Sequence, residues 1–340
     1  MTQLTRIWSP IDYEKDGKQE DCLRLPISID TSAYGWVPIP LICIRNGNGS
    51  TAVLVAGVHG DEYEGQIGLM RLARNLEAED VAGRIIIIPC LNFPAVESGR
   101  RVSPIDEGNL NRLYPGQAHG TATSMIAHYI TSILLPMADL IVDLHSGGRS
   151  LLYTPCSLIR PGKTPEQHAK QVELLKVLGA PIGYLTDGTG MGGNTTLPAA
   201  AENSGVPVIT AELGGGATLN PVGTDLAVNG AMRLLKHIGI LPSCEVEAAG
   251  RVRLMKSSST GLMVYAQTDG LFEPLAEPGE DVAEGQLAGL IHWLHWPHRE
   301  PEKVFFARSG MVVSRRYPTL TKRGDCLFEL LQDIEPSPKA

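Results

Sequence analysis

The chain has 340 residues, of which 43% are hydrophobic and 19% carry a charge. This composition is typical of a globular protein that buries a sizeable core, in one large domain or in a large domain with a small one. The formal net charge of −8 argues against a basic surface. Nucleic acids and anionic membranes bind through such surfaces, so neither is an expected partner.

The start of the chain and its cysteines predict where the protein works. Residues 1–17 contain no apolar segment of the kind that directs secretion, and no stretch approaches the ~20 apolar residues that span a membrane. The six cysteines form no CxxC pair, and most have apolar neighbours, as Cys43 does. These features predict a cytoplasmic protein with free, buried thiols rather than disulfides.

Apolar runs and helical periods alternate through most of the chain. Residues 22–46 alternate apolar and polar positions, which predicts a pair of early strands. Buried strands are then predicted at 51–57, 84–91, 139–144 and 207–213, and helices at 62–77, 121–137, 164–178 and 221–238. This alternation predicts a layered αβα domain with a mixed, mostly parallel sheet, which places its ligands beyond the carboxyl ends of the strands.

The pattern changes after Pro242. Residues 245–335 show short strands and frequent turns without a helical period, and a weak repeat of about 40 residues relates 269–290 to 309–327. Two similar β halves predict a small all-β barrel or sandwich with approximate twofold symmetry. The predicted organisation is an α/β domain at 1–244, a β-rich domain at 245–335 and a tail at 336–340.

The strongest local signal is a histidine and a glutamate that follow the buried run at 51–57. His59 and Glu62 are three residues apart, so their side chains can converge at the edge of the sheet. His145 follows the strand at 139–144, and a parallel sheet can place two such strand ends side by side. Two imidazoles and a carboxylate suit Zn²⁺ and leave a fourth position for water, as catalytic zinc requires. The alternative is that His145 only caps a glycine-rich turn.

Two carboxylates accompany these candidate ligands. Glu212 lies between apolar residues at the end of the run at 207–213. Burial raises a carboxyl pKa, which suits a general base that deprotonates water and later protonates a leaving amine. Asp143 lies two residues before His145 and points to the same side of the strand, where it can accept the other N–H of the imidazole. For both carboxylates, a structural ion pair is the alternative.

A loop at 100–116 is rich in Pro, Gly and Asn and carries Arg100, Arg101 and Arg112. Arginines at the carboxyl edge of a sheet can bind a substrate carboxylate through two hydrogen bonds or stabilise an oxyanion. Because surface arginines are common, the residues alone leave these roles open.

Three further histidines, His292, His295 and His298, fall within seven residues between the two β halves. The segment ends in a proline and a charged turn, and no carboxylate base or oxyanion donor accompanies it. We interpret it as a surface loop or an interface rather than a metal site.

Four motifs in order resemble those of the succinylglutamate desuccinylase/aspartoacylase family, which are zinc hydrolases related to the zinc carboxypeptidases. These motifs are His59-x-x-Glu62, Asn111-Arg112, Asp143-Leu144-His145 and Glu212. The resemblance covers essentially the whole chain. It implies a zinc-carboxypeptidase-like αβα domain that holds one Zn²⁺ per chain through His59, Glu62 and His145.

The resemblance also implies roles for the remaining motif residues. Glu212 is the implied base, and Arg101 is the implied arginine that stabilises the oxyanion. Asn111 and Arg112 are implied to hold the carboxylate of the substrate. Where the family often has Asp-Leu-Asn-Arg, this chain has an asparagine at the first position, Asn109.

These features together predict a zinc-dependent amidohydrolase that removes an acyl group, expected to be acetyl, from a small N-acyl amino acid. The segments at 32–40 and 59–65 resemble one subgroup, the deacetylases that act on N-acetyl-L-2,4-diaminobutyrate in ectoine degradation. The alternatives are an N-succinyl- or N-acetyl-aspartate-type deacylase, a metallocarboxypeptidase and, least favoured, a metal-binding protein without catalysis. The expected partner is a small-molecule substrate, and association into a homo-oligomer is left open.

Overall fold

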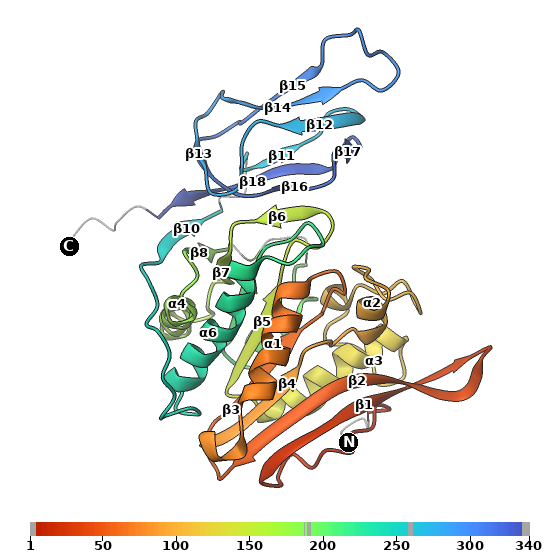
Figure 1. Cartoon of the computed structure of the whole chain (residues 1–340), viewed down its shortest axis with the longest axis vertical. Helices are drawn as coiled ribbons and strands as arrows, with labels where there is room; N and C mark the ends of the chain where they lie inside the picture. The colour runs from red at the N-terminus through yellow and green to blue at the C-terminus, as the bar shows by residue number, and fades with distance from the viewer. Residues whose placement is uncertain (1–4, 187, 189–191, 258–260, 335–340) are drawn as a thin grey trace.

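A computed structural model describes residues 5–186, 188, 192–257 and 261–334, so the predicted tail at 336–340 lies outside the described residues. A layered α/β body carries a C-terminal β region at one end (Figure 1). The strands of the body are β1 (Gly17–Ile29), β2 (Ser32–Asn46), β3 (Thr51–Ala56), β4 (Gly83–Ile88), β5 (Leu140–His145), β6 (Leu151–Tyr153), β7 (Cys156–Ile159), β8 (Ile182–Leu185) and β9 (Val208–Glu212). Its α-helices are α1 (Tyr63–Asn75), α2 (Phe93–Glu97), α3 (Ala122–Tyr129), α4 (Pro165–Leu178), α5 (Leu197–Asn203) and α6 (Pro221–His237). Short 3-10 turns are η1 (Ala78–Asp80), η2 (Leu110–Arg112) and η4 (Leu135–Met137), and η3 (Ile130–Leu134) is a π-helical turn.

The sheet of the body is mixed, with a parallel centre. Strands β4, β3, β5 and β9 run parallel in that order, and β1 and β2 add an antiparallel edge. Alternate residues of β3 enter two different cores: Val53 and Val55 pack with α3 and α5, whereas Ala52 and Leu54 pack with α1, α4 and α6. Helices therefore cover both faces of the sheet, and the predicted αβα fold class is confirmed.

The segment predicted as one helix over 121–137 differs in its second half. The α-helix begins after Thr121, whose side chain accepts the Ser124 amide hydrogen, and ends at Tyr129. A π turn and a 3-10 turn follow it. Pro136 lacks the amide hydrogen that an α-helix would direct to the carbonyl of Ser132, so the last turns repack. The sequence patterns also did not predict the short elements β6, β7, β8, α2 and α5.

The C-terminal region consists of strands alone among its described residues. They are β10 (Arg253–Lys256), β11 (Met263–Tyr265), β12 (Gly270–Pro274), β13 (Asp281–Val282), β14 (Leu287–His292), β15 (Glu302–Phe305), β16 (Gly310–Arg316), β17 (Leu320–Thr321) and β18 (Cys326–Asp333). In one half β12 pairs with β14, in the other β16 pairs with β18, and each half lends a short strand to its counterpart through β12–β17 and β16–β13. Phe272, Phe306 and Phe328 pack edge-to-face in the shared core. The predicted repeat corresponds to these two matching halves.

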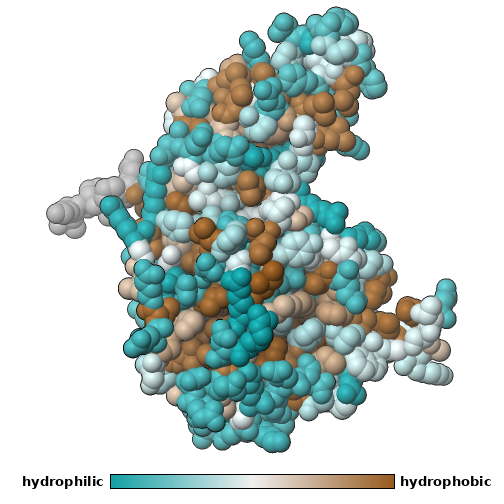
Figure 2. Space-filling model, in the orientation of Figure 1, coloured by the Kyte–Doolittle hydropathy of each residue, from teal (hydrophilic) through white to brown (hydrophobic). Residues whose placement is uncertain are grey.

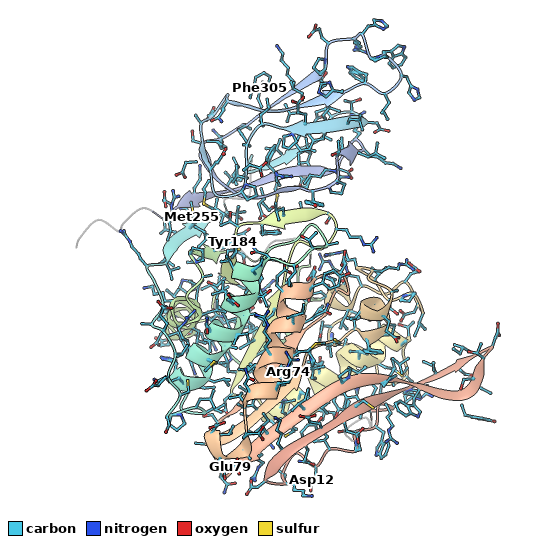
Figure 3. All side chains as sticks on the ribbon, viewed as in Figure 1. Asp12, Arg74, Glu79, Tyr184, Met255 and Phe305 are labelled. Carbon is cyan, nitrogen blue, oxygen red and sulfur yellow. The ribbon has the colours of Figure 1, made fainter. Side chains whose placement is uncertain are left out.

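Backbone hydrogen bonds join the two parts of the chain. Strand β10 lies parallel to β8 and antiparallel to β18, and β6 pairs with β16. Figure 3 labels Tyr184 and Met255 at this junction. The C-terminal region is therefore held against the body by a continuous sheet, and the domain boundary near residue 245 stays a prediction.

The body has a hydrophilic end, and the cysteines form no disulfides among the described residues. Hydrophilic residues gather at the end of the body farthest from the C-terminal region (Figure 2), where Asp12 and Glu79 lie (Figure 3). All six cysteines are free, and three of them are buried. In the part of the chain that the structure describes, no helix is both long and apolar enough to cross a membrane.

Candidate active site

The loop after β3 brings His59 and Glu62 to the carboxyl edge of the sheet. Gly57 turns the chain with a φ of +68°, and Glu62 is the residue that precedes α1. A Cβ at Gly60 would lie 2.0 Å from the carbonyl carbon of Ala95, so only glycine lets the loop pass this close to α2. The loop is therefore fixed by backbone packing, and both His59 and Glu62 are buried.

The three predicted metal ligands meet at one point. Glu62 lies between the two imidazoles, with Oε1 2.7 Å from Nδ1 of His59 and Oε2 2.9 Å from Nδ1 of His145. The backbone N–H of Ser146 also donates to Oε2, at 3.2 Å. One ligand atom from each of the three residues lies within 4.8 Å of the others. The structure thus brings His59, Glu62 and His145 together as a group that could hold a metal ion.

The outer nitrogen of each imidazole has a polar partner. Nε2 of His145 lies 3.0 Å from Oδ2 of Asp143, although the pair is not aligned as a hydrogen bond. Nε2 of His59 lies 3.2 Å from Oδ1 of Asn109, which also accepts the backbone N–H of Asn111 at 3.0 Å. Since Asn109 presents an acceptor, we assign the proton of His59 to Nε2, which leaves the lone pair of Nδ1 facing Glu62. The sequence patterns indicated no role for Asn109, and the available signal was its position in the Asn-Leu-Asn-Arg motif.

This donor arrangement fits a cation. A lone pair and a carboxylate oxygen repel each other at 2.7 Å unless a proton or a metal ion lies with them. Burial opposes ionisation of Glu62, but the positive charge that His59 and His145 carry when protonated outweighs burial and holds the pKa of Glu62 well below its usual range. An ionised carboxylate with two imidazoles is a donor set that Zn²⁺ accepts.

Glu212 lies beside this set on the next strand. It is paired in register with His145 across β5 and β9. Its Oε2 atom is buried and has no hydrogen-bond partner within the described residues. Burial, together with the charge of Glu62, raises the pKa of Glu212 to about 8. A carboxylate with a raised pKa and a free oxygen can accept and return a proton near neutral pH.

The arginine loop separates its two adjacent arginines. Arg101 lines the cavity next to the histidines, and its Nη1 lies 3.3 Å from Oε1 of Glu62. Arg100 instead donates to Glu107 at 2.8 Å on the surface and is absent from the cavity lining. Of the two candidates, Arg101 is therefore the one that faces the site.

Asn111 and Arg112 also line the cavity. The side-chain oxygen of Asn111 accepts the backbone N–H of Leu197 at 2.9 Å, which fixes the amide and leaves its NH₂ group for a ligand. Arg112 donates to the backbone oxygen of Asn111 at 2.8 Å. Among the described residues no carboxylate pairs with Arg112, so its guanidinium is available to an anionic group.

The cavity has a volume of about 720 Å³ and is closed partly by the C-terminal region. That region contributes the lining residues Ser257, Leu262, Met263, Tyr265, Glu329 and Leu330. The sequence patterns placed no site residue there. A carboxylate within an apolar run, as in Phe328-Glu329-Leu330, was the available signal.

The histidine-rich segment lies away from this cavity. His292 ends β14 and pairs with Glu273 at 2.7 Å, and the hairpin to β15 carries Trp293 under the guanidinium of Arg299. His295 and Trp296 are exposed at its tip. Across the described ranges, the only group of His, Cys, Asp and Glu residues close enough to hold a metal is His59, Glu62 and His145.

A mixed sheet with a parallel centre, helices on both faces and a buried His₂Glu group at its carboxyl edge defines a class of α/β protein with a candidate metal site. Residues 48–238 match the succinylglutamate desuccinylase/aspartoacylase catalytic domain. The N-alpha-acetyl-L-2,4-diaminobutyric acid deacetylase of Halomonas elongata is 36% identical over 97% of this chain and 96% of its own. The chain therefore belongs to the succinylglutamate desuccinylase/aspartoacylase family, as the motifs predicted, and it is a deacylase, which hydrolyses an acyl amide bond.

Solved structures agree over the whole length. The product-bound ectoine utilization protein EutE (DoeB) of Ruegeria pomeroyi superposes with a TM-score of 0.93 at 38% identity, covering 97% of this chain and 99% of the other. A succinylglutamate desuccinylase/aspartoacylase of Rhodobacter sphaeroides gives a TM-score of 0.92 at 36% identity, covering 97% and 100%. Both alignments include the C-terminal β region, so the part of the cavity that this region closes belongs to the shared fold.

Proposed function

We propose that this deacylase is a zinc-dependent deacetylase of Nα-acetyl-L-2,4-diaminobutyrate, which it hydrolyses to acetate and L-2,4-diaminobutyrate in the breakdown of ectoine. The observation that carries the proposal is the meeting of a His₂Glu group, a carboxylate with a raised pKa and an unpaired guanidinium in one cavity. The substrate follows from the relative named for this activity and the structure named for ectoine use, each matching 97% of the chain.

In this proposal His59, Glu62 and His145 hold the metal, with Asn109 and Asp143 orienting the two imidazoles. When bound, zinc would act as a Lewis acid that polarises the acyl carbonyl. It would also lower the pKa of water, so that water can lose a proton and attack the carbonyl near neutral pH. Glu212 takes the proton from that water, because its Oε2 is the buried, unpaired acceptor beside the ligands. It then returns the proton to the leaving amine.

The arginines divide the negative charges of the reaction. Arg101 lies next to Glu62, where it can stabilise the oxyanion that forms from the acyl carbonyl. Arg112 and the NH₂ group of Asn111 hold the α-carboxylate of the substrate, since both line the cavity without a competing carboxylate among the described residues. Location in the cytoplasm and the assembly of several copies stay predictions.

The test is a comparison of substrates with the zinc-loaded protein. Turnover is measured for Nα-acetyl-L-2,4-diaminobutyrate, its Nγ-acetyl isomer, N-acetyl-L-aspartate, N-succinyl-L-glutamate and a peptide with a free carboxyl end, with metal analysis of the same sample. We expect the highest kcat/KM for the Nα-acetyl diamino acid. Faster turnover of an acyl-aspartate, of succinylglutamate or of the peptide would overturn the proposed substrate.

A further inference from the structure

A third carboxylate, Glu329, faces the cavity from the C-terminal wall. It lies on β18, more than a hundred residues after Glu212 in the sequence, and lines the same cavity as the histidines and Arg112. The residue is 6% exposed. The proposed hydrolysis does not use this residue, yet a buried carboxylate in an active-site cavity requires a physical reason.

Hydroxyl groups from three strands fix the carboxylate of Glu329. Tyr184 on β8 donates to Oε1 at 2.9 Å, and Tyr153 on β6 donates to Oε2 at 3.1 Å. Ser314 on β16 lies 3.4 Å from Oε2. Tyr184 is labelled at the junction of the two parts of the chain in Figure 3. These strands join the body to the C-terminal region, so the carboxylate is held rigidly with both oxygens acting as acceptors.

Glu329 has hydroxyl partners but no cationic one among the described residues. Burial raises its pKa above the usual value, although the three hydroxyl groups act in the opposite direction. An arginine or lysine beside it would have removed this penalty, and buried carboxylates are ordinarily paired in that way. The folded chain therefore offers no counter-charge to the Glu329 carboxylate when it is ionised.

Glu212 serves proton transfer in the proposed reaction, and the other charges of the cavity account for one another with a single exception. Arg160 pairs with Glu202 at 3.0 Å, and Arg101 contacts Glu62 at 3.3 Å. Arg112 is the exception, because no carboxylate of the described residues pairs with it. Apart from Glu212 and the candidate metal ligands, the cavity thus presents one unpaired cation, Arg112, from the body and one unpaired carboxylate, Glu329, from the C-terminal region. A ligand that satisfies both carries a carboxylate and a separate positive group.

We propose that Glu329, held by Tyr153 and Tyr184, is the subsite for a side-chain ammonium group of the substrate. This inference rests on the proposed function, because an Nα-acetyl diamino acid has a neutral acyl amide, an α-carboxylate and one ammonium group. The carboxylate pairs with Arg112 and the ammonium with Glu329. The hydroxyl groups keep the oxygens of Glu329 in place as acceptors before the substrate arrives, so little ordering is needed on binding.

The experiment compares two substrates of equal shape in two proteins. N-acetyl-L-norvaline replaces the ammonium of Nα-acetyl-L-2,4-diaminobutyrate by a methyl group, and Glu329→Gln removes the charge while keeping the size of the side chain. We expect the ratio of kcat/KM for the cationic over the neutral substrate to fall about 10- to 100-fold in Glu329→Gln, mainly through KM, because a charged hydrogen bond is lost. Glu329→Asp keeps the charge and should retain part of the preference.

Glu273→Gln is the matched control, since Glu273 is an exposed carboxylate of the same region that lies outside the cavity lining. It should leave the ratio as in the unaltered protein. Thermal unfolding of each variant shows that the fold is intact. A ratio that changes less than about twofold in Glu329→Gln would overturn the subsite and leave Glu329 a structural role.

Binding of L-2,4-diaminobutyrate and of L-norvaline, measured by calorimetry on the zinc-loaded protein, separates this inference from the proposed function. If the unaltered protein binds the diamino acid selectively, and Glu329→Gln loses that selectivity, the subsite stands even where hydrolysis of the acetyl compound fails. If hydrolysis proceeds but neither binding nor the kcat/KM ratio depends on Glu329, the proposed function stands and the subsite is wrong.

Discussion

The cavity has two walls, the carboxyl edge of the sheet and the C-terminal region, and their charged groups have different partners. At the carboxyl edge of the sheet, Glu62 contacts two imidazoles and Arg101 within 3.3 Å. On the C-terminal wall, Glu329 meets only hydroxyl groups among the described residues. Mutually paired groups keep their geometry without a ligand, which suits a metal centre, whereas a carboxylate without a counter-charge gains most when a cation arrives. Under the proposed function, the residues at the sheet edge carry out the chemistry, and Glu329 selects for a cationic side chain.

The largest effect is expected from removing one of the predicted metal ligands at the sheet edge. His145→Ala removes one of three ligands, so bound zinc and deacylase activity should both be lost. Metal analysis of the purified protein and turnover are read on the same sample. His295→Ala removes an exposed imidazole away from the cavity and should retain both. Survival of zinc and activity in His145→Ala would show that the metal lies elsewhere.

Glu212→Gln should separate metal binding from catalysis. Glu212 is not among the metal-binding group, so the variant should keep its zinc. The amide cannot accept a proton, and loss of a general acid–base group lowers kcat by about 10²- to 10⁴-fold. Steady-state kinetics and metal content are the measurements. A variant that keeps kcat within about twofold would mean that another group is the base.

Arg101 and Arg100 form a natural pair for the next comparison. Arg101→Ala should lower kcat by about 10²- to 10³-fold, the effect of removing one oxyanion donor. Arg100→Ala should stay within about threefold of the unaltered protein, because Arg100 pairs with Glu107 at the surface. Equal losses from the two substitutions would contradict the assignment of Arg101.

The sequence predicted the site residues at the sheet edge, but none of those in the C-terminal region. The buried strands β3, β5 and β9 are short apolar runs. His59 follows the end of β3, and β5 and β9 end at His145 and Glu212, so periodicity placed three polar groups at one sheet edge. Strands such as β6, with three residues, are too short to show a period. Their position depends on pairing with β16, which is distant in the sequence.

Glu329 shows why the second wall was missed. Its local pattern, a carboxylate within an apolar run, is the pattern that singled out Glu212. What distinguishes the two is the packing of β18 against β10 and β16, which brings Glu329 to the cavity. Pairing between distant strands cannot be detected from the spacing of residues in one sequence. The strand that carries Glu212 can be predicted from its own apolar run.

The smallest expected effect tests whether Glu329 reduces stability, as a group kept for binding would. Its folded pKa is raised, so the native state resists ionisation of this carboxyl. The stability that the protonated form provides is complete below the unfolded pKa near 4.3 and is lost as pH rises through the folded value. Glu329→Gln removes this loss, and its Tm should exceed that of the unaltered, ligand-free protein by about 2 °C at pH 8, with a smaller difference at pH 4. Thermal unfolding at both pH values measures the two differences. An equal Tm at pH 8 would mean that hydroxyl groups alone stabilise the ionised carboxylate. Glu329 would then lack the stability cost that distinguishes it from the paired groups at the sheet edge.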